Sequence, residues 1–143
     1  MSTRTVAQYM TRGPRTVGPL ETLEEAHRVM REWRIRHLPV LEAGVLRGVL
    51  SQRDLYLMET LQGVNPADVP VHEAMRADVL SVAPGAELEA VVASMWRDKR
   101  GAVLVVEERR LLGIFTTSDA LRALVELLAK RREAGGGIDL PAP

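Results

Sequence analysis

The sequence predicts an α/β (α+β) protein built from two copies of one β-α-β-β-α unit. When the 143-residue sequence is shifted against itself by 65 positions, residues 6–55 align with 71–120 without a gap. Of these 50 positions 12 are identical, whereas ordinary composition would give about three matches by chance. Helical spacing of apolar residues and short continuous apolar runs recur in the same order in both copies. An internal duplication therefore predicts the fold class.

Each copy opens with a short strand, predicted at 15–17 and 80–82, that is followed by a proline. A first helix comes next, with apolar residues at i, i+3, i+4 and i+7 that predict one buried face. In the second copy these residues are Leu88, Val91, Val92 and Met95. In the first copy Thr22 and Glu25 form a capping-box pattern at the start of this helix.

Two short apolar runs joined by a turn follow the first helix and predict a hairpin of buried strands. The runs lie at 38–41 and 45–50 in the first copy, and at 102–106 and 111–115 in the second. A second helix then closes each copy. It is expected to end at Gly63 in the first copy, and after Lys130, Arg131 and Arg132 in the second.

These elements divide the chain into four segments. We predict repeat 1 at 6–63, a linker at 64–70, repeat 2 at 71–134 and a flexible tail at 135–143. The linker is brief and contains two prolines, so the two repeats are expected to pack together rather than move freely.

Composition excludes several classes of function. Lys plus Arg and Asp plus Glu both number 19, so the formal net charge is zero, and neither a nucleic-acid partner nor a membrane partner is expected. There is no cysteine, which excludes thiolate chemistry, and three scattered histidines predict no metal site. No long apolar stretch is present, and we predict a cytoplasmic protein. Because no nucleophile or acid–base pair stands out, an enzyme is not expected.

One motif recurs where a strand meets the second helix of each copy. Gly48 is followed by Ser51 and Asp54, and Gly113 by Thr116 and Asp119, at the same spacing. A hydroxyl three residues before a carboxylate is also a helix-capping box, so each motif alone has a purely structural interpretation. However, a helix start suits phosphate and a nearby carboxylate accepts ribose hydroxyls, so the repetition favours a nucleotide site.

Three features together resemble the cystathionine-β-synthase (CBS) domain. They are the Gly-x-x-(Ser/Thr)-x-x-Asp motif, the repeated Met and Pro positions and the run from His37 to Val40. Two tandem copies resemble a CBS pair, or Bateman module, over roughly residues 6 to 128. The resemblance implies two repeats packed through their sheets about a pseudo-twofold axis. It also implies two clefts between them that hold adenosyl ligands such as AMP, ADP, ATP or S-adenosylmethionine.

Carried over by position, the resemblance gives each cleft a set of residues. One cleft would combine Ser51, Arg53 and Asp54 with Leu80, Ser81, Arg100, Gly101 and Ala102. The other would combine Thr116, Ser118 and Asp119 with Thr16, Arg36, His37 and Pro39. Asp54 and Asp119 would hold ribose. Phosphate contacts would come from Ser51, Arg53, Thr116, Ser118, Arg36, His37 and Arg100, and adenine contacts from Thr16, Pro39, Leu80, Ser81 and Ala102.

The clefts are expected to differ chemically, because Ala102 stands opposite His37 in the alignment and Leu104 replaces a proline common in the family. His37 is equally consistent with a structural histidine, and Arg36 and Arg100 with solvated surface charges.

The resulting hypothesis is a regulatory module that binds an adenine nucleotide and signals to an unknown protein effector. The nucleotide is a regulatory ligand, no cofactor is required, Mg²⁺ would accompany only ATP, and a homodimer is expected. The alternative is a nucleotide-free interaction or scaffold pair in which the Ser/Thr-x-x-Asp motifs remain only as helix caps.

Overall fold

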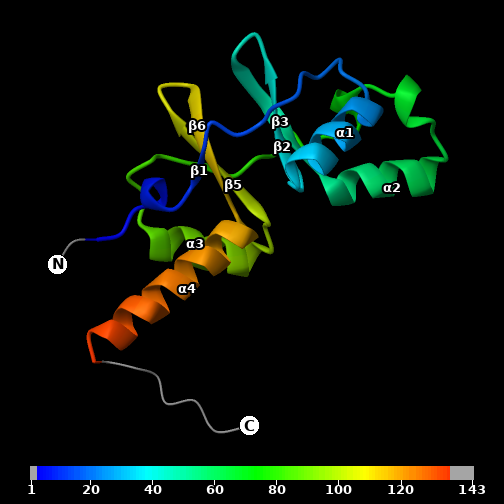
Figure 1. Ribbon diagram of the computed structural model, residues 1–143. Helices are drawn as coiled ribbons and strands as arrows, with labels where there is room; N and C mark the ends of the chain where they lie inside the picture. The colour runs from blue at the N-terminus through cyan, green and yellow to red at the C-terminus, as the bar shows by residue number, and fades with distance from the viewer. Residues whose placement is uncertain (1–2, 136–143) are drawn as a thin grey trace, which may run out of the picture.

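The computed structural model describes residues 3–135, except for the side chains of residues 61 and 62, and it forms two lobes (Figure 1). The first lobe contains α1 (Leu23–Trp33), β2 (His37–Glu42), β3 (Val45–Ser51) and α2 (Gln52–Gln62). The second lobe contains β4 (Ser81–Val82), α3 (Leu88–Asp98), β5 (Ala102–Glu107), β6 (Arg110–Thr116) and α4 (Thr117–Glu133). A short strand, β1 (Thr11–Arg12), and three 3₁₀ turns, Val6–Gln8, Pro66–Asp68 and Val71–Glu73, complete the described elements.

The duplication is visible element by element. The bounds of α1, β2 and β3 shifted by 65 residues give those of α3, β5 and β6, and both hairpins bulge at the same relative position, after Val40 and after Val105. The two helices that close the lobes differ in length, since α2 has 11 residues and α4 has 17. The predicted α+β fold of two equivalent β-α-β-β-α repeats is thus confirmed.

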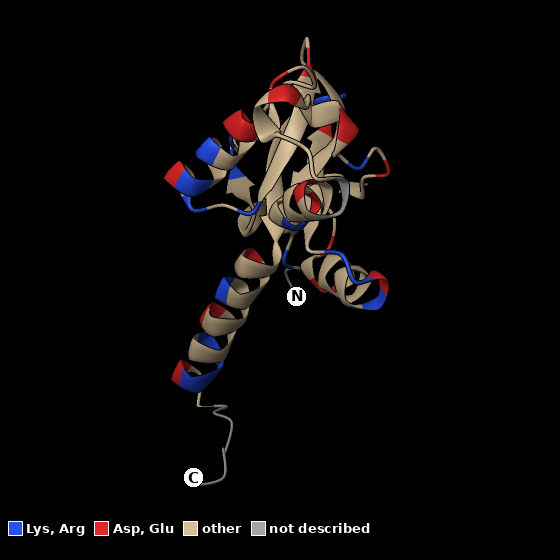
Figure 2. Ribbon diagram, turned by 90° about the vertical axis from the view of Figure 1, so that its right-hand side faces the viewer, with Lys and Arg blue, Asp and Glu red and all other residues tan. Residues whose placement is uncertain are grey.

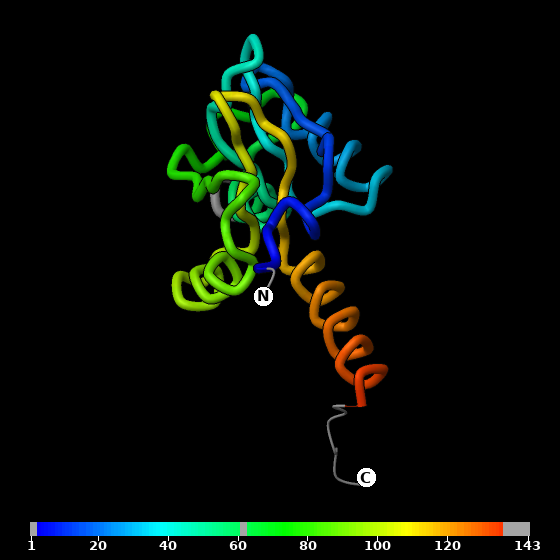
Figure 3. Tube along the Cα trace, turned by 90° about the vertical axis from the view of Figure 1, so that its left-hand side faces the viewer, coloured from blue at the N-terminus to red at the C-terminus, as the bar shows by residue number. Residues whose placement is uncertain are grey.

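The start of each repeat packs on the opposite lobe. β1, from the start of the first repeat, pairs antiparallel with β6, and Val6, Tyr9 and Met10 lie in the core of the second lobe. In the same way Val71 lies in the core of the first lobe, and Arg76 bridges to Val49 of β3. Figure 3 shows the N-terminal segment that contains β1 beside the hairpin of the second lobe. The lobes therefore exchange their first segments, which the repeat pattern did not predict.

A glycine permits each exchange. A Cβ built on Gly48 would lie 2.5 Å from the carbonyl oxygen of Arg76, and one on Gly113 would lie 2.7 Å from that of Thr11. No side chain fits between these backbones, so the glycine of the repeated motif serves close packing of the exchanged segment.

The strand predicted at 15–17 was only partly found. Val17 forms a single parallel bridge to Val40, whereas its counterpart Val82 belongs to β4, which pairs in parallel with β5. The predicted second helix of the first repeat does end at Gly63, whose φ of 61° is the left-handed conformation that a glycine adopts easily.

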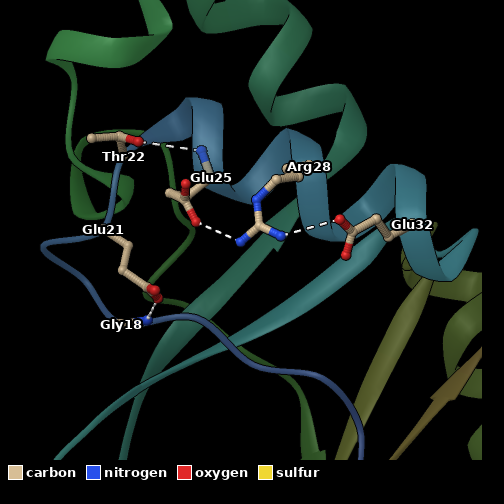
Figure 4. A network of polar contacts seen from close by, with 6 residues as sticks. All are labelled: Gly18, Glu21, Thr22, Glu25, Arg28 and Glu32. Atoms are coloured by element: carbon tan, nitrogen blue, oxygen red, sulfur yellow. Dashed lines mark hydrogen bonds and ion pairs between the residues drawn. The ribbon is translucent and has the colours of Figure 1, made fainter.

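The start of α1 confirms half of the predicted capping box. The hydroxyl of Thr22 accepts a hydrogen bond from the backbone N–H of Glu25 at 3.2 Å (Figure 4). The Glu25 carboxylate does not return to the backbone N–H of Thr22, because it accepts a hydrogen bond from Arg28 at 2.7 Å. Arg28 also donates to Glu32 one turn further along. The full box was therefore a wrong prediction, since a guanidinium one turn away competes for the carboxylate.

α4 extends from the second lobe and carries Lys, Arg, Asp and Glu along its length (Figure 2). Its last turn contains Lys130, Arg131 and Arg132, which complement the negative end of the helix dipole as expected. No helix in the described range combines the length and apolar character needed to cross a bilayer. The predicted flexible tail lies outside the described residues apart from Gly135.

Candidate functional site

One large cleft opens between the two lobes, with a volume of about 880 Å³. The first lobe contributes the start of β2 and the β3–α2 junction, which contains the repeated Ser-x-x-Asp motif. The second lobe contributes residues 76–80, which precede β4, and residues 98–102, which join α3 to β5. A cleft of this size fits the range of small-molecule sites, about 300–1,000 Å³.

Asp54 lies in this cleft at the first turn of α2, and only 9% of the residue is exposed. Its Oδ2 accepts the backbone N–H of Ser51 at 3.0 Å, and the Ser51 hydroxyl accepts the N–H of Asp54 at 3.0 Å. Its Oδ1 accepts Nε of Arg76 at 3.3 Å. The carboxylate therefore caps α2 and also meets a cation that comes from the exchanged segment of the second repeat.

Asp119 is equally buried, at 6% exposure, but has more partners. Oδ2 accepts both the backbone N–H and the hydroxyl of Thr116, at 2.9 and 3.1 Å. Oδ1 accepts the hydroxyl of Thr11 at 3.0 Å and lies 3.4 Å from a terminal nitrogen of Arg122. The capping box recurs in the second lobe, with an additional arginine in contact with its carboxylate.

The cleft has a positive excess, because five cationic side chains and three acidic side chains line it. The cationic residues are Arg36, Arg53, Arg76, Lys99 and Arg100, and the acidic ones are Asp54, Asp78 and Asp98. Arg100 donates to the Asp78 carboxylate at 3.1 Å and to its carbonyl at 3.0 Å. Among the described residues Arg36 and Arg53 have no ion-pair partner, so their guanidinium groups remain available to an anion.

No group of three or more His, Cys, Asp or Glu side chains within the described range is arranged to hold a metal ion. The polar side chains of the cleft are its guanidinium and ammonium cations, the three aspartates, the imidazole of His37, the hydroxyl of Ser51 and the amide of Gln52.

His37 lies at the start of β2, at the edge of the first lobe, and its ring faces Gly101 across the cleft. A Cβ on Gly101 would lie 3.3 Å from Nε2 of His37, so the glycine leaves space for the imidazole. Burial lowers the pKa of His37 below its usual value. The charge of Asp54 opposes this shift and that of Arg36 adds to it. The neutral ring is consequently the favoured form in the folded protein at neutral pH.

This lowered pKa predicts an acid-sensitive fold. The unfolded chain binds a proton at His37 more readily than the folded chain does. The stability contributed by the neutral imidazole is therefore complete above the pKa of His37 in the unfolded chain, about 6.5, and is lost as the pH falls through the lower pKa of the folded chain. We expect the free energy of unfolding, measured by urea denaturation from pH 8 to 5, to decline less steeply in His37→Gln than in the wild type.

His72→Gln is the matched control, since His72 is exposed and lies outside the cleft. Parallel stability profiles for the wild type and His37→Gln would contradict the assignment.

The structure brings together most of the residues predicted for the first cleft. These are Ser51, Arg53, Asp54, Leu80, Arg100, Gly101 and Ala102. Ser81 does not line the cleft, because it lies in β4 one residue beyond Leu80 and its side chain is exposed elsewhere.

The cleft contains only part of the second predicted group. Arg36, in the loop after α1, and His37, at the start of β2, line it together with residues 98–102. Thr16, Thr116, Ser118 and Asp119 are absent from its lining. Pro39 is fully buried in β2, which leaves no surface for an adenine.

Sequence reasoning missed several cleft residues. Arg76, Lys99, Asp78 and Asp98 line the cleft but carried no motif. Arg76 is the counterpart of Thr11 in the alignment, and both contact the motif carboxylate of the opposite lobe. The exchange that creates both contacts has no local sequence signature.

The molecule consists of two lobes that share one fold, exchange their first segments and meet along a cationic cleft. These features place it in the class of internally duplicated α+β proteins. A family model of the CBS domain matches residues 6–57 and 71–126. The chain therefore belongs to the CBS-domain family and carries two copies of the domain.

Individual relatives agree with this. The CBS domain-containing protein YhcV of Bacillus subtilis is 33% identical over 114 residues, covering 80% of this chain and 81% of its own. A crystal structure of a Vibrio cholerae protein named for acetoin utilization (AcuB) is 35% identical, with a TM-score of 0.84 over 98% of this chain and all of that one. The structure of CBSX2 in complex with AMP is 25% identical, with a TM-score of 0.73 over 86% and 97% of the two chains.

Proposed function

We propose that this protein is a regulatory module that binds an adenosyl nucleotide, AMP, ADP, ATP or S-adenosylmethionine, in the cleft between its repeats. The main support is that one cleft combines the Asp54 carboxylate with the unpaired cations Arg36 and Arg53. A carboxylate accepts the hydroxyls of a ribose and guanidinium groups bind phosphate, so the two chemistries required by a nucleotide lie in one cavity. The AMP complex of the related CBSX2 supports an adenine ligand.

The positive excess of the cleft favours phosphorylated ligands over S-adenosylmethionine, whose sulfonium is cationic. In this proposal Mg²⁺ reaches the cleft only as the complex of ATP. The role is regulatory rather than catalytic, with ligand occupancy passed to an effector protein. A ligand that contacts both lobes stabilises the arrangement in which both contacts are made.

We expect calorimetric titration to detect binding of at least one phosphorylated adenosine ligand. At a concentration of about 100 times Kd, a ligand specific for the folded state stabilises it by about 2.7 kcal/mol, which a thermal unfolding assay detects as a higher Tm. AMP, ADP, ATP and S-adenosylmethionine are compared at up to millimolar concentration, with adenine alone as the control for the ribose and phosphate contacts. The absence of heat and of any Tm increase with all four would contradict the proposal.

The second candidate is a nucleotide-free interaction module. It is favoured by the two complete capping boxes, which give Asp54 and Asp119 structural roles without any ligand. Exposed apolar residues on α4 are a further indication of protein contacts, and we assign them to a homodimer. Co-purification followed by mass spectrometry distinguishes the two candidates, since only the first predicts a bound nucleotide. The cytoplasmic location predicted from the sequence stays a prediction.

A further inference from the structure

The motif carboxylates of the two repeats, Asp54 and Asp119, differ in how many hydrogen-bonding positions they have left for a ligand. A carboxylate offers about four lone-pair positions for hydrogen bonds. Asp54 uses one on each oxygen, for the N–H of Ser51 and Nε of Arg76. Two positions therefore remain, which matches the two hydroxyls of a ribose.

Asp119 has no comparable capacity. Two donors from Thr116 bind Oδ2, the hydroxyl of Thr11 binds Oδ1, and Arg122 forms an ion pair with Oδ1, so three hydrogen bonds and one ion pair occupy the group. Arg122 is also fixed by a hydrogen bond that it donates to the carbonyl of Tyr9. Its counterpart in the first repeat, 65 residues earlier, is Leu57, which has no donor for Asp54.

A second difference concerns Arg15 and Trp33, two residues of the first repeat that contact each other. The guanidinium of Arg15 stacks on the ring of Trp33, 3.5 Å from its centroid. The counterparts of these residues, Leu80 and Asp98, both line the open cleft. At these positions the first repeat therefore has two side chains in contact with each other, whereas the second repeat has two residues that line the cleft.

The cations are distributed just as unevenly. Arg36 and Arg53 line the open cleft, whereas their counterparts in the second repeat are Gly101 and Ser118. Asp119 does not line this cleft.

From these observations we propose that each chain binds one nucleotide, with its ribose on Asp54, and that the Asp119 position is closed by Thr11 and Arg122 of the same chain. The inference rests on the proposed function, because it assumes a nucleotide as the ligand. It adds that the duplication left one binding site and one structural carboxylate. Arg122 acts in the closed half as a built-in partner that takes the place of a ligand hydroxyl.

The direct test is the stoichiometry of binding, measured by calorimetric titration of the full chain with ATP, ADP and AMP. We expect one ligand per chain. Asp54→Asn is expected to weaken binding by about 10- to 100-fold, because a charged acceptor is lost. Asp68→Asn is the matched control, since it makes the same change at an exposed position outside the cleft. Two equal sites per chain, or unchanged affinity in Asp54→Asn, would overturn the inference.

A measurement without ligand separates this inference from the proposed function. In urea denaturation of the free protein, Asp119→Asn is expected to lower the unfolding midpoint more than Asp54→Asn, because more contacts are lost. If no nucleotide binds, the proposed function fails, and this comparison still tests the closed carboxylate. Equal midpoints for the two variants would contradict closure even if one nucleotide binds per chain.

Discussion

Replacement of Gly113 by alanine is expected to lower the free energy of unfolding by about 3 kcal/mol, the upper part of the range for overpacking. The new Cβ would lie 2.7 Å from the carbonyl oxygen of Thr11, and 2.6 Å from the sulfur of Met10. The methionine side chain can move, but the Thr11 carbonyl belongs to β1, which pairs with β6. Relief of the clash therefore requires β1 to separate from the lobe on which it packs. Urea denaturation measures the loss.

Gly85→Ala provides the matched control, because a Cβ at Gly85 meets nothing within 4 Å. It is expected to leave stability unchanged or to raise it by up to about 1 kcal/mol. Gly48→Ala repeats the test in the first lobe, where the clash is with the carbonyl of Arg76. If Gly113→Ala and Gly85→Ala were equally stable, the exchanged segment would not pack as described.

Introduction of glutamate at both Leu121 and Val125 is expected to raise the dissociation constant of the proposed homodimer by at least about 100-fold. Leu121, Leu124 and Val125 are each more than half exposed, at helical spacing on the face of α4 opposite to the buried Ala123. Burial of this stripe against a second copy would remove apolar surface from water, and charges at its centre would prevent that burial. Sedimentation equilibrium measures the change.

The comparison variant is Lys130→Glu, which changes the net charge by the same amount but lies on α4 away from the apolar stripe. It is expected to leave the oligomeric state unchanged. A wild-type chain that is monomeric at high concentration would rule out the dimer, and equal effects of the two variants would assign the result to net charge alone.

Much of the fold could be predicted because the information was local and present twice. The apolar spacing of Leu88, Val91 and Met95 predicts a helix with one buried face, and these three residues are buried on α3. The hairpins and the helix end at Gly63 follow in the same way from strand, turn and cap chemistry. What was missed in the fold, β1 and the crossing of the first segments, depends on contacts between residues outside any one local pattern, such as Thr11 with Ile114 and Arg76 with Val49.

The site was predicted in part for a related reason. The motif Ser51-x-x-Asp54 and its position at a helix start are local, so these residues were expected in a cleft and line one. The pairing of Arg36 and His37 with the second motif was not found, because cleft membership depends on how the lobes face each other. The distinction between Asp54 and Asp119 also escaped the sequence, since both have the same motif.

The amino-acid sequence by itself determined the duplication, the order of the four helices and two hairpins, and the Ser/Thr-x-x-Asp motifs at the helix starts, because the helices, hairpins and motifs depend on residues close together in the chain and the duplication repeats them. The tertiary structure alone decided which lobe receives each first segment, and thereby that Arg76 meets Asp54 and Thr11 meets Asp119. It also placed Arg122 on Asp119 by anchoring its guanidinium to the carbonyl of Tyr9, from the exchanged segment. The physical reason is that a carboxylate's free lone pairs depend on every donor that packing brings within reach, and most of those donors are distant in sequence.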